Sequence, residues 1–356
     1  DITGADFLPL SHDGNPLETV LGQYDNPRIA SPPGTMLGAA QKAWWKATMQ
    51  GSDATWKVWG NEVTLLRFDI RKEAVPTLIV DRLLGVDTWD GYPTERRELL
   101  EFLRTEGIEN VVSIAGDIHA HFAGIILDDY DGVAPNPVGF ELVTAGISSN
   151  SMFSFFEAAS RGQPAALRRV IVYDSTPDPV PGGWTELDRG DFVVNINLLL
   201  MRGSGSAQTM ALTNDLAAAL DDTDPTLNTH LRYADANAQG YGLCKVSATE
   251  CTASLVTIER PISQPTGAGP GVLRAAHFVI PAGAPAATEG PTFTGTPPSR
   301  ISCCTGIALT RQFFQHLFQL RELARRQPAR ERGVLRAHAQ RELRDQRFAA
   351  RSEIKA

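Results

Sequence analysis

Apolar residues recur at helical spacing in the first third of the chain. Leu37, Ala40, Trp44 and Ala47 predict a helix that ends near Gly51. A second helix is predicted over residues 93–107, because its leucines share one face and a glycine follows them. Glycine tolerates the left-handed conformation that commonly ends a helix. Residues 1–35 are rich in Gly, Pro, Asn and Asp, which indicates an irregular segment.

Short apolar runs between and after these helices predict strands. The predicted strands cover residues 54–59, 65–68, 77–80, 111–115, 140–143, 170–173, 192–200, 241–246, 253–258 and 272–280. One further helix is predicted over residues 207–220, and residues 281–298 have the composition of a linker or an extended edge. Alternation of helix, short loop and buried strand is typical of an α/β layered domain.

Composition and charge narrow the function classes. The chain has 356 residues, of which 42% are apolar, enough for a sizeable core. No run approaches the ~18 apolar residues of a membrane helix, so no transmembrane segment is predicted. From residue 300 onwards there are 13 Lys+Arg and 5 Asp+Glu, a net charge of +8. Because the whole chain has a net charge of −8, residues 1–299 have a net charge of −16. An acidic body argues against nucleic-acid binding, because phosphate backbones require a basic face.

One segment carries candidate chemistry. The apolar run 111–115 leads to Gly116, and Asp117, His119 and His121 follow at alternate positions. In extended backbone, alternate residues share a face, so Asp117 and His119 are predicted to point to one spot. A carboxylate with an imidazole suits a hydrolytic metal centre. The alternative is that Asp117 caps a turn and the histidines pack beside it.

Several motifs in one order connect this segment with a known family. They are Thr35-Met36-Leu37-Gly38, Ala54-Thr55-Trp56-Lys57-Val58 with Gly60-Asn61, Trp89-Asp90-Gly91-Tyr92-Pro93, Gly116-Asp117-Ile118-His119, Glu141-Leu142-Val143-Thr144 and Leu231-Arg232-Tyr233. In these motifs the chain resembles the alkaline phosphatase D (PhoD-like) family of metallophosphoesterases. The resemblance covers residues 35–295 approximately and corresponds to the C-terminal portion of the family's catalytic domain.

The resemblance implies a fold, a reaction and a metal site. The implied fold is α/β, a metallophosphoesterase-like mixed β-sandwich flanked by helices and incomplete at its N-terminal side. Residues 1–298 would form this domain and residues 299–356 a basic, Arg-rich tail, partly helical or disordered. The implied activity is hydrolysis of phosphomonoesters or phosphodiesters with Ca2+ and Fe3+. Carried over from the Gly-Asp-x-His motif, Asp117 is a calcium ligand and His119 an iron ligand, and an extracytoplasmic location is implied.

Two departures from the family pattern bear on activity. The upstream Gly-Asp-x-x-Tyr motif and the Asp-His-Glu motif, which supply the other metal ligands, have no counterpart in this sequence. The first residue is Asp1, and no basic-then-apolar leader follows it. We therefore expect an N-terminally incomplete chain with little activity alone. The alternatives are a phospholipase D-like phosphodiesterase and a non-catalytic fragment.

Further candidates each have two interpretations. Trp89, Asp90 and Tyr92 either line the phosphate site or pack and cap a turn. Asn61 either offers its amide oxygen near the metals or fixes a turn. His121 either supports the metal site or packs in the core.

The cysteine spacing predicts no disulfide in the hairpin at residues 241–258. With a four-residue loop, Cys244 faces position 253 and Cys251 faces position 246, so the two thiols are not directly opposed.

Overall fold

The computed structural model describes residues 17–19, 22–24, 32–70, 82–83, 87–160, 172–173, 193–213, 215–259 and 270–295. All of them belong to the first of two units into which the chain divides, residues 1–302 and 303–356. The predicted strand at 77–80 and the Arg-rich tail lie outside the described residues. Within the described part, no helix combines the length and the apolar character needed to cross a membrane.

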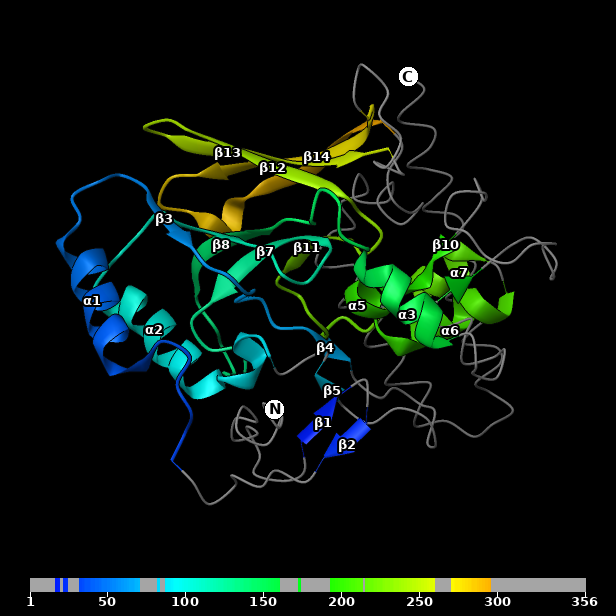
Figure 1. Ribbon diagram of the computed structural model, residues 1–356, viewed down its shortest axis with the longest axis horizontal. Coiled ribbons are helices and arrows are strands. Elements are labelled where there is room, and N and C mark those ends of the chain that lie inside the picture. The colour runs from blue at the N-terminus through cyan, green and yellow to red at the C-terminus, as the bar shows by residue number, and fades with distance from the viewer. Residues whose placement is uncertain are drawn as a thin grey trace, which may run out of the picture. The chain divides into compact units, whose positions relative to one another are not determined.

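A mixed five-stranded sheet forms the centre of the described fold (Figure 1). Its strands are β3 (Lys57–Gly60), β6 (Val111–Ala115), β7 (His121–Leu127), β8 (Pro137–Val143) and β11 (Leu231–Asp235). They lie in the order β11-β7-β8-β6-β3. β3, β6 and β8 are parallel, and β7 and β11 are antiparallel to their neighbours. The carboxyl ends of β3, β6 and β8 therefore lie at the same end of the sheet.

A second, antiparallel sheet covers one face of the first. Its strands are β12 (Gly240–Val246), β13 (Glu250–Ile258), β14 (Val272–Pro281) and β15 (Glu289–Gly295), in chain order. One hydrophobic cluster joins the two sheets, with Val112, Ile125 and Phe140 from the first and Leu255 and Phe278 from the second. This shared core confirms the predicted mixed β-sandwich.

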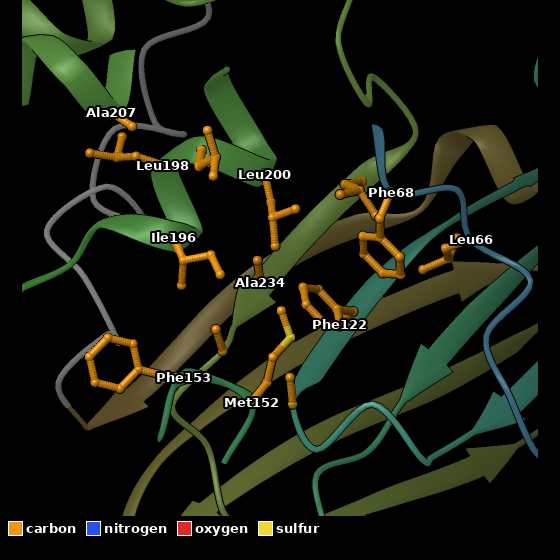
Figure 2. Packing of buried hydrophobic residues seen from close by; sticks show 14 of the residues in the cluster. Leu66, Phe68, Phe122, Met152, Phe153, Ile196, Leu198, Leu200, Ala207 and Ala234 are labelled. Carbon is orange, nitrogen blue, oxygen red and sulfur yellow. The ribbon is translucent and has the colours of Figure 1, made fainter. Parts of the chain in front are cut away.

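Helices cover the opposite face of the five-stranded sheet. At one end, α1 (Gly38–Gly51), η2 (Trp89–Gly91) and α2 (Pro93–Thr105) pack on Trp59 and Val111. At the other end lie α3 (Met152–Ser160), α5 (Asn195–Arg202), α6 (Ser204–Thr213) and α7 (Leu216–Asp221). Their core, in which Met152 lies beside Phe122, is shown in Figure 2. The sandwich is thus flanked by helices, as predicted.

The smaller elements complete the described chain. They are a four-stranded sheet of β1 (Leu17–Thr19), β2 (Gly22–Tyr24), β5 (Arg82–Leu83) and β4 (Asp69–Ile70), a pair of β9 (Val172–Tyr173) and β10 (Val193–Val194), and η3 (Pro285–Ala287). The strands β1 and β2 correct the prediction of an irregular segment over residues 1–35. β15 is the extended edge that was one of the two predictions for residues 281–298.

Three predicted elements differ in the structure. Residues 65–68 form no strand, because side-chain carboxylates take the backbone N–H groups of Leu65, Leu66 and Phe68. Residues 192–200 form β10 and then α5, since an apolar run that is buried on all sides has no period that distinguishes strand from helix. The helix predicted over 207–220 is two helices, and Asp215 caps the second by accepting from the N–H groups of Ala217 and Ala218.

Candidate functional site

The chain leaves β6 at Ala115 and makes a tight turn through Gly116 to Ala120. Asp117 and His119 both have left-handed backbone, with φ of 65° and 59°. The prediction of extended backbone at these residues is therefore wrong, and alternation does not decide where their side chains point. A non-glycine residue in this conformation costs on the order of 1–3 kcal/mol, and such strain concentrates at functional sites. Two strained residues in one short turn favour a functional role.

Neighbouring backbone fixes the strained turn. The N–H of Ile118 donates to the Gly116 carbonyl at 2.7 Å, and the N–H of Met152 at the start of α3 donates to the His119 carbonyl at 2.8 Å. The N–H of Gly116 donates to the carbonyl of Glu62, just beyond β3, at 3.2 Å. The turn is thus held from within, from α3 and from the segment after β3.

The His119 ring is held in a defined tautomer. Its Nδ1 lies 2.7 Å from the Asn150 carbonyl oxygen. A carbonyl oxygen only accepts, so Nδ1 carries the proton, and in the neutral ring the lone pair is on Nε2. A second ring contact is with Phe155, at 5.6 Å between centroids. An imidazole whose one nitrogen donates to a backbone carbonyl presents the other as a metal ligand, which is the usual arrangement of metal-binding histidines.

His121, two residues further on, is placed differently. It is fully buried at the start of β7. Its Nδ1 accepts from the N–H of Ala145 at 3.0 Å, so its Nε2 donates to the Val256 carbonyl at 3.1 Å. Burial lowers its pKa, which keeps the ring neutral. Both nitrogens are used to join the two sheets, so the packing interpretation holds for His121.

Asn61 lies directly beside the turn. Its N–H donates to the Ile114 carbonyl of β6 at 2.9 Å, and its Oδ1 accepts from Trp89 Nε1 at 3.2 Å. Its amide oxygen is therefore occupied by Trp89. Its Nδ2 is buried and has no hydrogen-bond partner among the described residues. A buried donor without an acceptor is costly in a folded protein, so a ligand atom that accepts from Nδ2 would stabilise it.

The other three predicted substrate-binding groups lie around η2. Trp89 is fully buried and packs against Trp59 with ring centroids 6.3 Å apart. Asp90 is buried, accepts from the Phe68 N–H at 2.9 Å and pairs with Arg96 at 2.7 Å. Tyr92 is half-buried at the start of α2. These contacts give Trp89 and Asp90 structural roles, and direct contact of the three with substrate stays a prediction.

Glu141 is a buried carboxylate that sequence reasoning did not single out. It is fully buried on β8 and accepts from Thr64 Oγ1 at 2.6 Å, Ser113 Oγ at 2.8 Å and the N–H groups of Leu65 and Leu66. Burial raises its pKa. It fixes the segment that follows Asn61. The available signal was a charged residue inside an otherwise apolar strand.

Two candidate metal donors, a carboxylate and an imidazole, lie in the strained turn. The Asp117 carboxylate suits calcium and the His119 imidazole suits iron. Among the described residues, no group of three or more His, Cys, Asp or Glu gathers to hold an ion. Calcium alone takes 6–8 oxygen ligands. The described residues therefore fit two ligands of such a site and do not form a complete coordination shell.

Comparison with known proteins finds similarity to one family over part of the chain. Residues 13–175 match the model of the PhoD-like phosphatases. This part of the chain is similar to the PhoD-like phosphatases. Alkaline phosphatase D of Bacillus subtilis (strain 168) is 29% identical over 119 residues, which are 33% of this chain and 19% of that protein. A solved structure described as the structure of PhoD aligns with a TM-score of 0.47 at 17% identity, over 81% of this chain and 40% of that one.

The match to these relatives is partial. The chain spans about a fifth of the length of the curated PhoD-like relative that it matches. The family match includes β3, η2, β6, the turn at Asp117 and His119, and β8. It therefore contains all six candidate residues, and the relationship to phosphoesterases applies to the region that carries them.

Proposed function

We propose that this PhoD-like chain takes part in metal-dependent hydrolysis of phosphoric esters. The observation that carries the proposal is the His119 ring, which is fixed through Nδ1 and presents Nε2, in a strained turn shared with Asp117. Strain of this kind destabilises the fold and is retained where it positions functional groups. A curated protein similar to part of this chain is an alkaline phosphatase D.

Each residue would have a distinct part in this reaction. Asp117 and His119 would be ligands of Ca2+ and Fe3+, which as Lewis acids stabilise negative charge at phosphorus. Asn61 Nδ2, a buried donor without a partner among the described residues, would donate to a phosphate oxygen. Trp89 would orient Asn61 through its Nε1 hydrogen bond. Glu141 would hold the backbone that follows Asn61.

Two ligands in the described residues do not retain an ion tightly, so we expect little turnover by this chain alone. The remaining donors would come from protein outside the described residues. Monoesters, diesters and phospholipids all present the same phosphate oxygens, so the substrate class is an outcome of the assay. The resemblance to alkaline phosphatase D supports an extracytoplasmic location.

The test measures metal binding first and turnover second. The purified chain is titrated with Co2+ as a spectroscopic probe, and the ring nitrogens of the histidines are followed by 15N NMR. We expect the His119 Nε2 resonance to shift, with weak affinity, and the effect to be abolished by Asp117→Ala or His119→Ala. The control is His277→Ala, because His277 bonds Ser254 and Thr294 on the second sheet. Binding that is unchanged in both turn variants would overturn the proposal.

Turnover is assayed with p-nitrophenyl phosphate and bis(p-nitrophenyl) phosphate in the presence of calcium and iron. We expect rates far below the 1–10³ per second of ordinary enzymes. Any residual rate is expected to disappear in His119→Ala and to fall in Asn61→Ala. Preference for one ester over the other then distinguishes monoesterase from diesterase activity. A substantial rate that survives both substitutions would show that the reaction occurs elsewhere on the chain.

A further inference from the structure

Two thiols meet across the hairpin of β12 and β13, away from the turn at Asp117. In the register of these strands, Cys244 lies opposite Ala253 and Cys251 lies opposite Val246. Residues opposite each other share a face of the sheet, and so do alternate residues on one strand. All four side chains therefore lie on the inner face, and Cys244 and Cys251 are diagonal neighbours. The predicted register is confirmed, and both cysteines are free thiols.

The two thiols differ in access to solvent. β12 is the edge strand of its sheet, and Cys244 on it is exposed. Cys251 is fully buried in the core between the sheets. An oxidant can therefore reach Cys244 and not Cys251. Such an arrangement, an accessible thiol beside a sheltered one, is that of a redox-active pair with an attacking and a resolving cysteine.

We propose that Cys244 and Cys251 form a reversible dithiol site, which low-molecular-weight disulfides such as glutathione disulfide oxidise to an intramolecular disulfide. The Cys244 thiolate attacks one sulfur of glutathione disulfide, forming a mixed disulfide and releasing one glutathione. The Cys251 sulfur then loses its proton, attacks the Cys244 sulfur and releases the second glutathione. Two protein thiols lose two electrons and two protons, and glutathione disulfide gains them.

The local electrostatics favour this order of attack. Interaction with the neighbouring Cys251 thiol lowers the pKa of Cys244. The same interaction, together with burial, raises the pKa of Cys251. The exposed sulfur is thus the one that becomes a thiolate first, and the thiolate is the nucleophile in disulfide exchange.

The diagonal geometry explains why the disulfide would be reversible. Diagonal neighbours across an antiparallel pair have Cα atoms about 7–8 Å apart, whereas disulfides usually span about 4.4–6.8 Å. Closure therefore requires β12 to shift by about 1 Å against β13. An edge strand has one hydrogen-bonded neighbour and can make such a shift. The resulting strain makes the bond easier to reduce than a structural disulfide.

The experiment uses the full chain with Cys303→Ser and Cys304→Ser, which leaves Cys244 and Cys251 as its thiols. It is equilibrated with mixtures of glutathione and glutathione disulfide, quenched in acid and analysed by intact mass after maleimide labelling. We expect loss of both reactive thiols without a bound glutathione. In Cys251→Ala the mixed disulfide at Cys244 should accumulate, and in Cys244→Ser the buried Cys251 should not react while the protein is folded.

Two matched variants test the geometry within the same strand. In Cys244→Ser with Lys245→Cys, the new thiol lies on the opposite face from Cys251, and no internal disulfide should form. In Cys244→Ser with Val246→Cys, the thiols are directly opposed, and the disulfide should resist reduction at glutathione ratios that reduce the native pair. A native pair that stops at the mixed disulfide, or that resists reduction as well as the directly opposed pair, would overturn the proposal.

Discussion

The turn after β6 and the buried hydrogen-bond network around Glu141 each contain a carboxylate, but one carboxylate belongs to an exposed residue and the other to a buried one. Glu141 is fully buried and accepts hydrogen bonds from Thr64, Ser113 and two backbone N–H groups. Asp117 is exposed and has strained backbone. A carboxylate with every partner supplied by its own fold stabilises that fold. A carboxylate on an exposed residue that is held in a costly backbone conformation is a candidate for binding a ligand.

His119 and His121 repeat this contrast two residues apart. His121 uses both ring nitrogens, one to bind the N–H of Ala145 just after β8 and the other to bind the carbonyl of Val256 on β13 of the second sheet. His119 uses Nδ1, and its Nε2 has no hydrogen-bond partner within the described part of the chain. Hydrogen-bond accounting therefore separates a structural from a candidate functional histidine where residue type and spacing do not. Four substitutions or conditions test this separation.

The largest effect is expected from the buried pair of Asp90 and Arg96. Arg96→Met leaves the Asp90 carboxylate buried without its cation, which should destabilise the fold by about 3–5 kcal/mol in urea unfolding. The matched control is Lys46→Met, which removes an exposed partner of Glu98 and should cost less than about 1 kcal/mol. Equal costs for the two variants would show that the Asp90 network does not carry the stability assigned to it.

Loss of the Glu141 carboxylate should have the next largest effect. Glu141→Ala leaves the donors of Thr64, Ser113, Leu65 and Leu66 without their acceptor, at about 1–3 kcal/mol for each that water does not reach. We expect a loss of about 3 kcal/mol in the free energy of unfolding. Glu289→Ala, at an exposed position on β15, should change it by less than about 0.5 kcal/mol. A loss at Glu141 as small as that at Glu289 would contradict the network's role.

The pH dependence of stability should report His121. Its folded pKa is lowered by burial, so below the unfolded value of about 6.5 the unfolded state binds a proton that the folded state does not. Its contribution is therefore present above pH 6.5 and is lost as the pH falls through that value. His121→Gln should reduce the slope between pH 6.5 and 5.5 by up to about 1.4 kcal/mol per pH unit.

The pKa of His230 is shifted in the same direction as that of His121, so His230 contributes to the pH dependence of stability with the same sign. Burial lowers its pKa to about 3, and its Nε2 donates to the Arg67 carbonyl. The slope that remains in His121→Gln should therefore include a contribution from His230 and should fall further in the double variant with His230→Gln. A slope that is unchanged in His121→Gln would mean that this ring is protonated in the folded protein.

The smallest effect should have the opposite sign. Asp117→Gly removes the side chain that makes a φ of 65° costly, and we expect it to raise the free energy of unfolding by up to about 1 kcal/mol. Asp117→Asn keeps a side chain that tolerates this conformation and should change stability by a few tenths of a kcal/mol. Destabilisation by Asp117→Gly would place Asp117 with the structural carboxylates and count against its proposed ligand role.

Elements with a regular apolar pattern and a clear end signal, such as a glycine, could be predicted from the sequence. α2 ends where Gly107 adopts φ of +65°, and β6, β12 and β13 follow their apolar patterns. The strand predicted over residues 192–200 is present only as β10, and α5 begins at Asn195, because a run buried on every side carries no period. The prediction at 65–68 was wrong, because the acceptors for its backbone are distant in sequence: Glu141 lies 76 and 75 residues from Leu65 and Leu66, and Asp90 lies 22 residues from Phe68.

The candidate site was predictable in its residue types and not in its geometry. Motif order pointed to Asp117, His119 and Asn61, and all three lie at the end of β3 or in the turn after β6. The sequence did not indicate that Asn61 presents its nitrogen and not its oxygen. That depends on the Trp89 indole, a donor brought to Asn61 by the packing of η2 against β3.

The sequence by itself determined the resemblance to PhoD-like phosphatases, the layered sandwich and the residues of the Gly-Asp-x-His turn, because these depend on local pattern and motif order. Only the tertiary structure decided which polar groups are satisfied and which remain available. That distinction depends on contacts between distant segments, such as Asn150 with His119 and Val256 with His121. A hydrogen bond needs both partners within about 3 Å, and sequence spacing does not specify that distance for residues far apart in the chain.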